Sequence, residues 1–159
     1  MGAKETLVPK STIKYTGTFD FKSLKTVLER FFDDYNYDFS EEIYKDKGKG
    51  VLKDTVIEWV CWRDFDDNTK LILKITFELN DYKEVVIDNK RVIEGDLVIK
   101  YKAIVERDFN NKWKGAKRLF LRSVYDKFIN VKKQEKAAHE LKKMTEDFVN
   151  EIKKYLKLK

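Results

Sequence analysis

Apolar and polar residues alternate most regularly between residues 69 and 79. Every second residue from Leu71 to Leu79 is apolar, and most of the residues between them are polar. Because successive side chains of a strand point to opposite faces, this period of two predicts a strand with one buried face. Residues 54–65 and 95–107 alternate in a similar way. We therefore expect three long strands side by side in an antiparallel sheet.

Shorter patterns add further strands. Residues 12–18 and 37–44 alternate and predict one strand each. The turn residues at 88–91 separate Val85 and Ile87 from Val92, which predicts a short hairpin at the sheet edge. Gly95 then allows a kink or bulge before the next strand. The total is five to seven strands.

Helical spacing of apolar residues occurs in three segments. Residues 21–36 follow Asp20, a good N-terminal capping residue, and carry one wide apolar stripe. Residues 113–129 and 132–158 predict two amphipathic C-terminal helices. The expected core stripe of the last helix is Ala138, Leu141, Met144, Phe148, Ile152 and Tyr155.

The element order indicates an α+β fold in which all three helices pack on the antiparallel sheet. At 159 residues, one domain spanning residues 1–159 is expected, with residues 1–10 disordered and residues 112–159 forming a basic helical part. A strand, a helix, several antiparallel strands and a long helix is also the order of the helix-grip fold. The second C-terminal helix departs from that order.

Charge is divided unevenly along the chain. The net charge is +6, but residues 1–111 carry −3 and residues 112–159 carry +9. A basic C-terminal part indicates an acidic partner or attraction to the sheet. The candidate partner surface is Lys114, Lys117, Arg118, Arg122, Lys132, Lys133, Lys142 and Lys143.

The sheet itself offers a second candidate surface. Apolar residues occur on both faces of the strand at 54–65, so Val60, Trp62 and Ile104 form a candidate exposed sheet face. Four lysines fall on the same outer face if the strand register brings them together. They are Lys70, Lys74, Lys100 and Lys102.

Catalytic, cofactor and metal signatures are weak. Cys61, the only cysteine, is predicted in the sheet, and His139, the only histidine, is predicted to be exposed on the last helix, so neither has a partner. The glycine-containing loop at 45–50 lacks the ending of a phosphate-binding loop, and the acidic turn at 64–68 lacks the glycine and glutamate of a calcium loop. We expect no catalytic residue, no cofactor and no metal, so an enzyme is disfavoured.

Three stretches resemble a group of small uncharacterised archaeal proteins, over most of the chain from about residue 10. They are Ile13–Phe21 with its Tyr-Thr-Gly-Thr-Phe-Asp run, Tyr37-Asp38-Phe39, and residues 121–129 with Tyr125-Asp126-Lys127. The resemblance implies an archaeal, intracellular origin and no particular activity. It also argues against acylation at Gly2, although Met1, Gly2 and Thr6 fit the myristoylation pattern.

The functional expectation is a non-catalytic binding or assembly module that engages a protein or other acidic partner, including a second copy. The alternative is a helix-grip-like carrier with an apolar small molecule in a cavity between the sheet and the C-terminal helix. Nucleic acid is a weaker partner because lysine greatly outnumbers arginine, which usually reads bases. No apolar run approaches the ~20 residues of a membrane span, and we expect a cytoplasmic protein.

Overall fold

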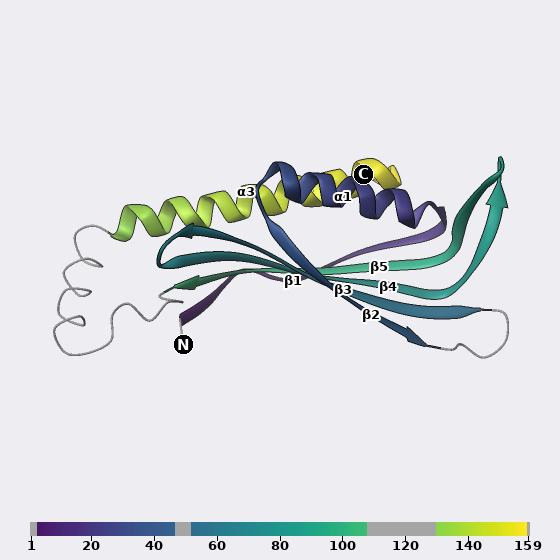
Figure 1. Cartoon of the computed structure of the whole chain (residues 1–159), viewed down its shortest axis with the longest axis horizontal. Coiled ribbons are helices and arrows are strands. Elements are labelled where there is room, and N and C mark those ends of the chain that lie inside the picture. The colour runs from purple at the N-terminus through teal and green to yellow at the C-terminus, as the bar shows by residue number, and fades with distance from the viewer. Residues whose placement is uncertain (1–2, 47–51, 108–129, 159) are drawn as a thin grey trace.

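The computed structural model describes residues 3–46, 52–107 and 130–158, and within them the fold is α+β (Figure 1). Five antiparallel strands form one sheet in the order β1-β5-β4-β3-β2. Two described helices accompany the sheet. The elements are β1 (Ala3–Phe19), α1 (Phe21–Asp34), β2 (Asp38–Asp46), β3 (Lys53–Asp66), β4 (Thr69–Ile87), β5 (Lys90–Arg107) and α3 (Asn130–Leu156).

The central strands follow the alternating pattern of the sequence. Leu71, Leu73, Ile75, Phe77 and Leu79 of β4 are all buried, as the period of two predicts. The predicted hairpin forms, with Val85 opposite Val92 across the turn at Asp88 and Asn89, but its strands are not separate elements. Residues 82–87 and 90–93 are instead the far ends of β4 and β5, which pair along their whole length in the interior of the sheet order. The strand total is therefore five.

Gly95 lies where the β4–β5 ladder bends, as the sequence predicts. Asn80 opposes Asp96 and Lys83 opposes Glu94, so Asp81 and Tyr82 together lie opposite Gly95. An extra residue in one strand increases its bend. Beyond this point the hairpin curls toward the side of the sheet that carries the helices (Figure 1).

The expected disorder of residues 1–10 is wrong for the part that the structure describes. Strand β1 begins at Ala3, and Ala3 to Thr6 pair with Arg107 to Ile104 of β5. Leu7 and Val8 also pack against the core. Pairing along β5 satisfies the backbone groups of this segment, which the weakly alternating sequence around Pro9 does not reveal.

Both described helices cover the same face of the sheet (Figure 1). Helix α1 begins after Asp20, whose carboxylate accepts a hydrogen bond from the Ser23 backbone N–H at 3.1 Å. Its buried residues are Phe21, Leu24, Leu28, Phe31 and Phe32.

Helix α3 supplies the other half of this helical layer. Leu141, Met144, Phe148 and Ile152 are buried as predicted, whereas the stripe continues through Ala137 and Leu156 in place of Ala138 and Tyr155. The helix predicted at 113–129 lies outside the described residues.

Aromatic rings fill the space between the sheet and the helices. Phe32 lies 5.7 Å from Phe148 and 6.3 Å from Trp59 between ring centroids, and Trp59 lies 5.2 Å from Phe77. All four side chains are fully buried. These rings pack on one another as a core, so they do not line a cavity.

Candidate functional site

The face of the sheet opposite the helices, here called the outer face, carries the candidate site. Along β4 and β5, the side chains that alternate with those facing the helices point to this face. Their order across the ladder places Ile72 opposite Ile104, Lys74 opposite Lys102, and Thr76 opposite Lys100. Neither α1 nor α3 covers this face (Figure 1).

Two lysines of the outer face oppose each other directly. Lys74 on β4 and Lys102 on β5 are register partners in an antiparallel ladder. Like charges in this position are unfavourable, on the order of a few tenths of a kcal/mol. Within the part of the chain that the structure describes, no carboxylate forms an ion pair with either side chain. The pair is therefore an uncompensated positive centre.

A bulge in β1 brings a third lysine to this centre. Val8 opposes Ala103 and Ser11 opposes Tyr101, so Pro9 and Lys10 together lie opposite Lys102. Bulges of this kind redirect side chains, and the missing N–H of proline is tolerated at a bulge in an edge strand. Lys10 was not among the predicted site residues, because residues 1–10 were expected to be disordered. Pro9, within a segment that alternates weakly, was the sequence feature that could have indicated a bulge here.

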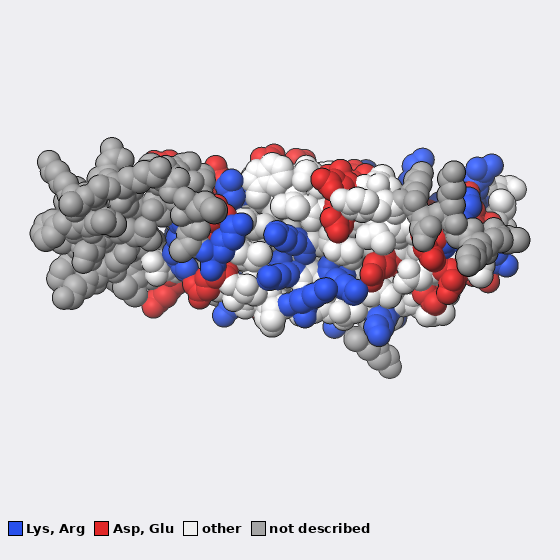
Figure 2. Space-filling view, turned by 90° about the horizontal axis from the view of Figure 1, so that it is seen from below, with Lys and Arg blue, Asp and Glu red and all other residues white. Residues whose placement is uncertain are grey.

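These side chains enclose an open hollow of about 270 Å³. We call it the lysine hollow, and define it by Lys10, Lys74, Lys100 and Lys102 with Thr76 and Tyr101. Lys100 forms an ion pair with Glu78 at 3.1 Å. Figure 2 shows basic side chains gathered near the middle of this face. Three amines of the hollow thus lack a described carboxylate partner, which favours binding of an anionic group.

The predicted basic outer face is confirmed for Lys74, Lys100 and Lys102, which the register brings together. Lys70 lies on the same face farther along β4, between Asp64 of β3 and Glu106 of β5. The row of Trp62, Ile72 and Ile104 separates it from the lysine hollow.

The β2–β3 side of the outer face has the opposite charge. Glu42 and Glu58 are register partners in the β2–β3 ladder and are both exposed. The Tyr44 hydroxyl donates to Glu42, and this hydrogen bond to a carboxylate raises the pKa of Tyr44. Glu58 is also the register partner of Thr76 on β4. We call Glu42 and Glu58 the glutamate pair.

The predicted exposed sheet face is only partly correct. Val60 and Trp62 lie on the outer face and are half-buried. Ile104 lies on the same face, but the prediction that it is exposed is wrong, because only 5% of its surface is accessible. Ile72 and Thr6 flank it across the two ladders, and close cross-strand neighbours cover a side chain at such a position.

The predicted basic surface of the C-terminal helices is not assembled in the described residues. Lys114, Lys117, Arg118 and Arg122 lie outside them, and the side chains of Lys132 and Lys133 are not described. Lys142 and Lys143 are exposed on α3, and Lys143 pairs with Asp147 at 3.0 Å. Residues 134–156 hold five lysines and five acidic residues, so this part of α3 has no net charge.

The two residues considered for catalysis, Cys61 and His139, lie in different environments. Cys61 is fully buried in β3, and burial raises the pKa of its thiol. His139 is exposed on α3, as predicted, beside an Arg63–Glu140 ion pair of 3.3 Å. Among the described residues no group of His, Cys, Asp and Glu side chains has the arrangement of a metal site.

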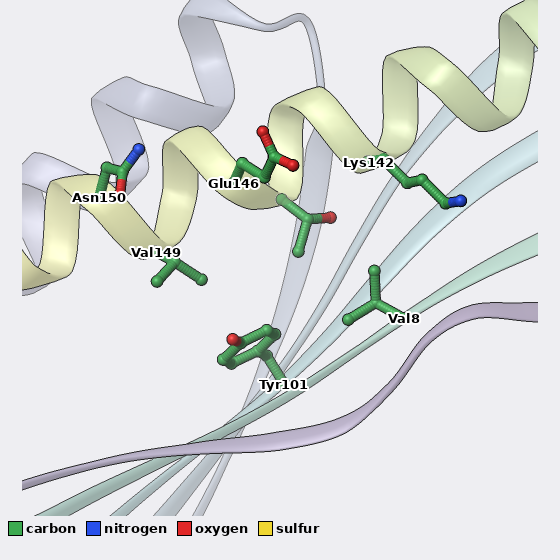
Figure 3. Close-up of a pocket in the computed structure, with 7 residues that line it drawn as sticks. Val8, Tyr101, Lys142, Glu146, Val149 and Asn150 are labelled. Carbon is green, nitrogen blue, oxygen red and sulfur yellow. The ribbon is translucent and has the colours of Figure 1, made fainter.

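A second hollow lies beside α3, between that helix and the strands β1 and β5. Its volume is about 430 Å³. Val8 and Tyr101 from the strands and Val149 from α3 give it an apolar lining, and Lys142, Glu146 and Asn150 also come from α3 (Figure 3). The buried Thr145 donates its hydroxyl to the Leu141 carbonyl at 2.8 Å. We call this feature the α3 groove.

Comparison of the chain with protein-family models, curated proteins and solved structures found no match. Of the described helices, neither combines the length and the apolar character needed to cross a membrane.

Proposed function

We propose that this protein is a non-catalytic binding or assembly module that engages an acidic partner through the lysine hollow. The observation that carries the proposal is the direct opposition of Lys74 and Lys102, without a described carboxylate partner, on a face that the described helices leave open. An acidic group placed between the two amines relieves their repulsion and gains charge-assisted hydrogen bonds.

The register of the strands fixes the geometry of this site. Lys74, Lys100 and Lys102 belong to the two strands with the longest ladder in the sheet, and the bulge in β1 adds Lys10. Side chains on paired strands occupy defined positions, unlike those on loops. An acidic peptide segment or protein surface with two or more closely spaced carboxylates suits such an array. The preference for carboxylates on a protein over nucleic acid follows from the absence of arginine in the hollow.

The proposal is tested with fluorescent poly-L-glutamate as an acidic peptide probe. We expect salt-sensitive binding in fluorescence anisotropy at low ionic strength, since exposed charges are screened by salt. The double charge reversal Lys74→Glu/Lys102→Glu is expected to weaken binding by about tenfold or more, roughly 1.4 kcal/mol. A matched control is Lys22→Glu/Arg30→Glu, which removes the same charge from exposed positions on α1.

Equal weakening by the two double variants would show that only the net charge matters, and the proposal would fail. Single-stranded DNA serves as a second probe. Tighter binding of DNA than of poly-L-glutamate, lost in the same Lys74→Glu/Lys102→Glu variant, would assign the hollow to nucleic acid instead.

A second candidate function is a helix-grip-like carrier of an apolar small molecule, and the α3 groove is the observation in its favour. In the sheet order β1 lies beside the last strand and β2 forms the opposite edge, and α3 packs along one face. The groove has an apolar lining and lies between α3 and this sheet. A volume of about 430 Å³ is within the range of small-molecule sites.

This candidate is tested by native mass spectrometry of the purified protein. A carrier should retain a co-purifying molecule, and Val149→Trp, which fills the groove, should abolish that extra mass. Val86→Trp is the control, because Val86 is 66% exposed at the end of β4, away from the groove. A spectrum of the bare chain for the unmodified protein would count against the carrier.

A further inference from the structure

We propose that the acidic partner of the lysine hollow is a second copy of this chain, packed outer face against outer face across a two-fold axis. This inference rests on the proposed function, because it names the partner of the same site. The axis runs along the strands, between β3 and β4. The lysine side of each copy then covers the glutamate side of the other.

The outer face carries its two charges on opposite sides of one sheet. Reading across the ladders, Glu42 on β2 is followed by Glu58 on β3, Thr76 on β4 and Lys100 on β5. In the adjacent row Lys74 and Lys102 occupy the β4 and β5 positions. Over these two rows the face is therefore acidic on β2 and β3 and basic on β4 and β5.

Both sides also contain a like-charge pair in direct opposition. Glu42 faces Glu58, and Lys74 faces Lys102. Each pair is unfavourable within one copy. Bringing the two pairs together between copies relieves both repulsions at once, and an isologous two-fold interface forms this contact twice.

A two-fold axis along the strands gives the required superposition. Rotation about an axis between β3 and β4 places β4 of the partner over β3, and β5 of the partner over β2. Within the row just described, Lys100 then lies over Glu42 and Thr76 over Glu58. Lys74 and Lys102 lie one row away from the same carboxylates, within reach of long lysine side chains. Rotation about an axis across the strands would instead superpose lysine on lysine.

Apolar side chains provide the contact near the axis. Val60 and Trp62 on β3 are half-buried within one copy and point to the outer face, where Trp62 is the register partner of Ile72 on β4. In the proposed packing the partner's β4 lies over this part of β3. Two sheets packed face to face lie about 10 Å apart with their inner side chains interdigitated, so these residues become the centre of the interface.

The proposed axis superposes four strands, β2 to β5, and leaves β1 outside the contact. Four strands about 4.8 Å apart, over the nine residues of β2 at about 3.3 Å each, define a surface on the order of 600 Å². Stable interfaces bury roughly 800 Å² on each partner. The contact therefore has to extend over all four strands, from β2 to β5.

The inference is tested by charge exchange with the full chain. The unmodified protein should have twice the 19.0 kDa mass of one chain in sedimentation and light scattering at low ionic strength. Lys74→Glu/Lys102→Glu makes both sides acidic, and Glu42→Lys/Glu58→Lys makes both sides basic. Each variant alone should be monomeric, with a dimer dissociation constant raised by about tenfold or more. An equimolar mixture of the two variants should restore the dimer, since every contact again joins opposite charges.

Controls on α1 match the charge changes on the helical side of the molecule. Lys22→Glu/Arg30→Glu and Glu29→Lys/Asp33→Lys alter exposed residues and should leave the dimer intact. Where a charge-reversed variant loses its native circular dichroism spectrum, the neutral pairs Lys74→Gln/Lys102→Gln and Glu42→Gln/Glu58→Gln replace it. These neutral variants should each weaken the dimer.

A monomer at every concentration overturns the inference, as does a dimer that neither variant weakens or a mixture that stays monomeric. The proposed function fails separately. It is lost if the protein, diluted until it is monomeric so that no second copy covers the hollow, does not bind poly-L-glutamate through Lys74 and Lys102. A protein that is monomeric at every concentration and binds this probe keeps the lysine hollow and loses only the second copy as its partner.

Discussion

Asp20 lies between β1 and α1 and also contacts β5 and α3. Its carboxylate accepts the Ser23 N–H and pairs with Lys90 of β5 at 2.6 Å, while its backbone carbonyl accepts the Tyr155 hydroxyl of α3 at 3.0 Å. Burial raises the pKa of this carboxyl, but hydrogen bonds from Lys90 and Ser23 outweigh it and lower the pKa to about 2. The cap predicted from the sequence thus also holds the hairpin and the last helix.

Replacing Asp20 with Ala is expected to lower the free energy of unfolding by about 1–2 kcal/mol at neutral pH, because the cap and the Lys90 pair are both lost. Urea unfolding followed by circular dichroism measures this. The control is Asp33→Ala, at the exposed end of α1, which should change stability by less than about 0.5 kcal/mol. Equal effects of the two substitutions would contradict the role of the cap.

The contribution of Asp20 should depend on pH. Its pKa is about 2 in the folded chain and 3.8 ordinarily, so the unfolded state binds the proton first. The stabilisation is fully present above pH 3.8 and is lost as the pH falls through 2. The stability difference between the unmodified protein and Asp20→Asn should therefore shrink across this interval. A constant difference would show that the carboxylate charge is not involved.

Cys61 is expected to be unreactive in the folded protein. It has no accessible surface, and burial raises its pKa, so little thiolate is available for reaction. Ellman's reagent should give no rapid colour without denaturant and one thiol per chain in urea. Rapid reaction of the folded chain would contradict the placement of Cys61 in the core.

The sequence predicted the position and exposure of some single residues but not of others. Asp20 as a cap, the exposure of His139 and the shared face of Lys74, Lys100 and Lys102 follow from local chemistry or from period, and the structure agrees. The burial of Ile104 did not follow, because it depends on neighbours in two other strands. Lys10 was missed for the same kind of reason, since β5 fixes its position.

Among the elements, α3 packs against the core with one aromatic ring, that of Phe148. Phe148 is fully buried, with ring centroids 5.7 Å from Phe32 and 5.9 Å from Tyr101. Phe148→Ala should lower the free energy of unfolding by about 3–5 kcal/mol, from lost burial and the cavity left behind. Chemical denaturation measures the change, and Val86→Ala on the exposed hairpin end should have little effect. A small loss for Phe148→Ala would place α3 away from the core.

The bend of the β4–β5 hairpin depends on Gly95. A Cβ atom at this position would lie 2.7 Å from Cβ and 2.8 Å from Cα of Tyr82, so the backbone would have to shift. Gly95→Ala should lower the melting temperature, with a loss of about 1–3 kcal/mol. Glu94→Ala, exposed on the same strand, is the control. Unchanged stability of Gly95→Ala would mean that the two strands do not approach this closely.

The spacing of apolar residues predicted whether each described element is a helix or a strand, but it did not predict the length of every strand. The merger of the predicted hairpin with β4 and β5 was missed because the bulge at Asp81 and Tyr82 interrupts the alternation while the ladder continues. The extension of β1 to Ala3 was missed because its pairing partner, β5, lies far away in the sequence.

At the scale of the whole molecule, one continuous core joins the sheet to both described helices. Buried residues from β1, α1, β3, β4, β5 and α3 belong to the same cluster. Exposure of the Cys61 thiol and loss of helical circular dichroism should therefore coincide in urea. Thiol labelling and circular dichroism on the same samples measure this. Exposure of Cys61 before loss of the helices would indicate that the sheet opens separately.

Sequence patterns could not show which face both helices would choose or how charges from five strands would meet. The alternation around Trp59 indicated apolar groups on both faces of β3. It therefore did not decide which face the helices would cover. Only the strand order decides that the glutamate pair and the lysine hollow lie side by side on one face. That arrangement is the basis of the proposed assembly.

The interruption of β1 at Pro9 has a consequence for solubility. An unbroken outer strand offers its free backbone groups to any passing chain and can seed fibrils, whereas a proline, a bulge and lysines discourage such growth. Here β1 carries Pro9, two register shifts and Lys10 within a few residues. Replacing Pro9 with Val should therefore increase thioflavin-positive aggregation on prolonged incubation, even if the folded protein becomes no less stable.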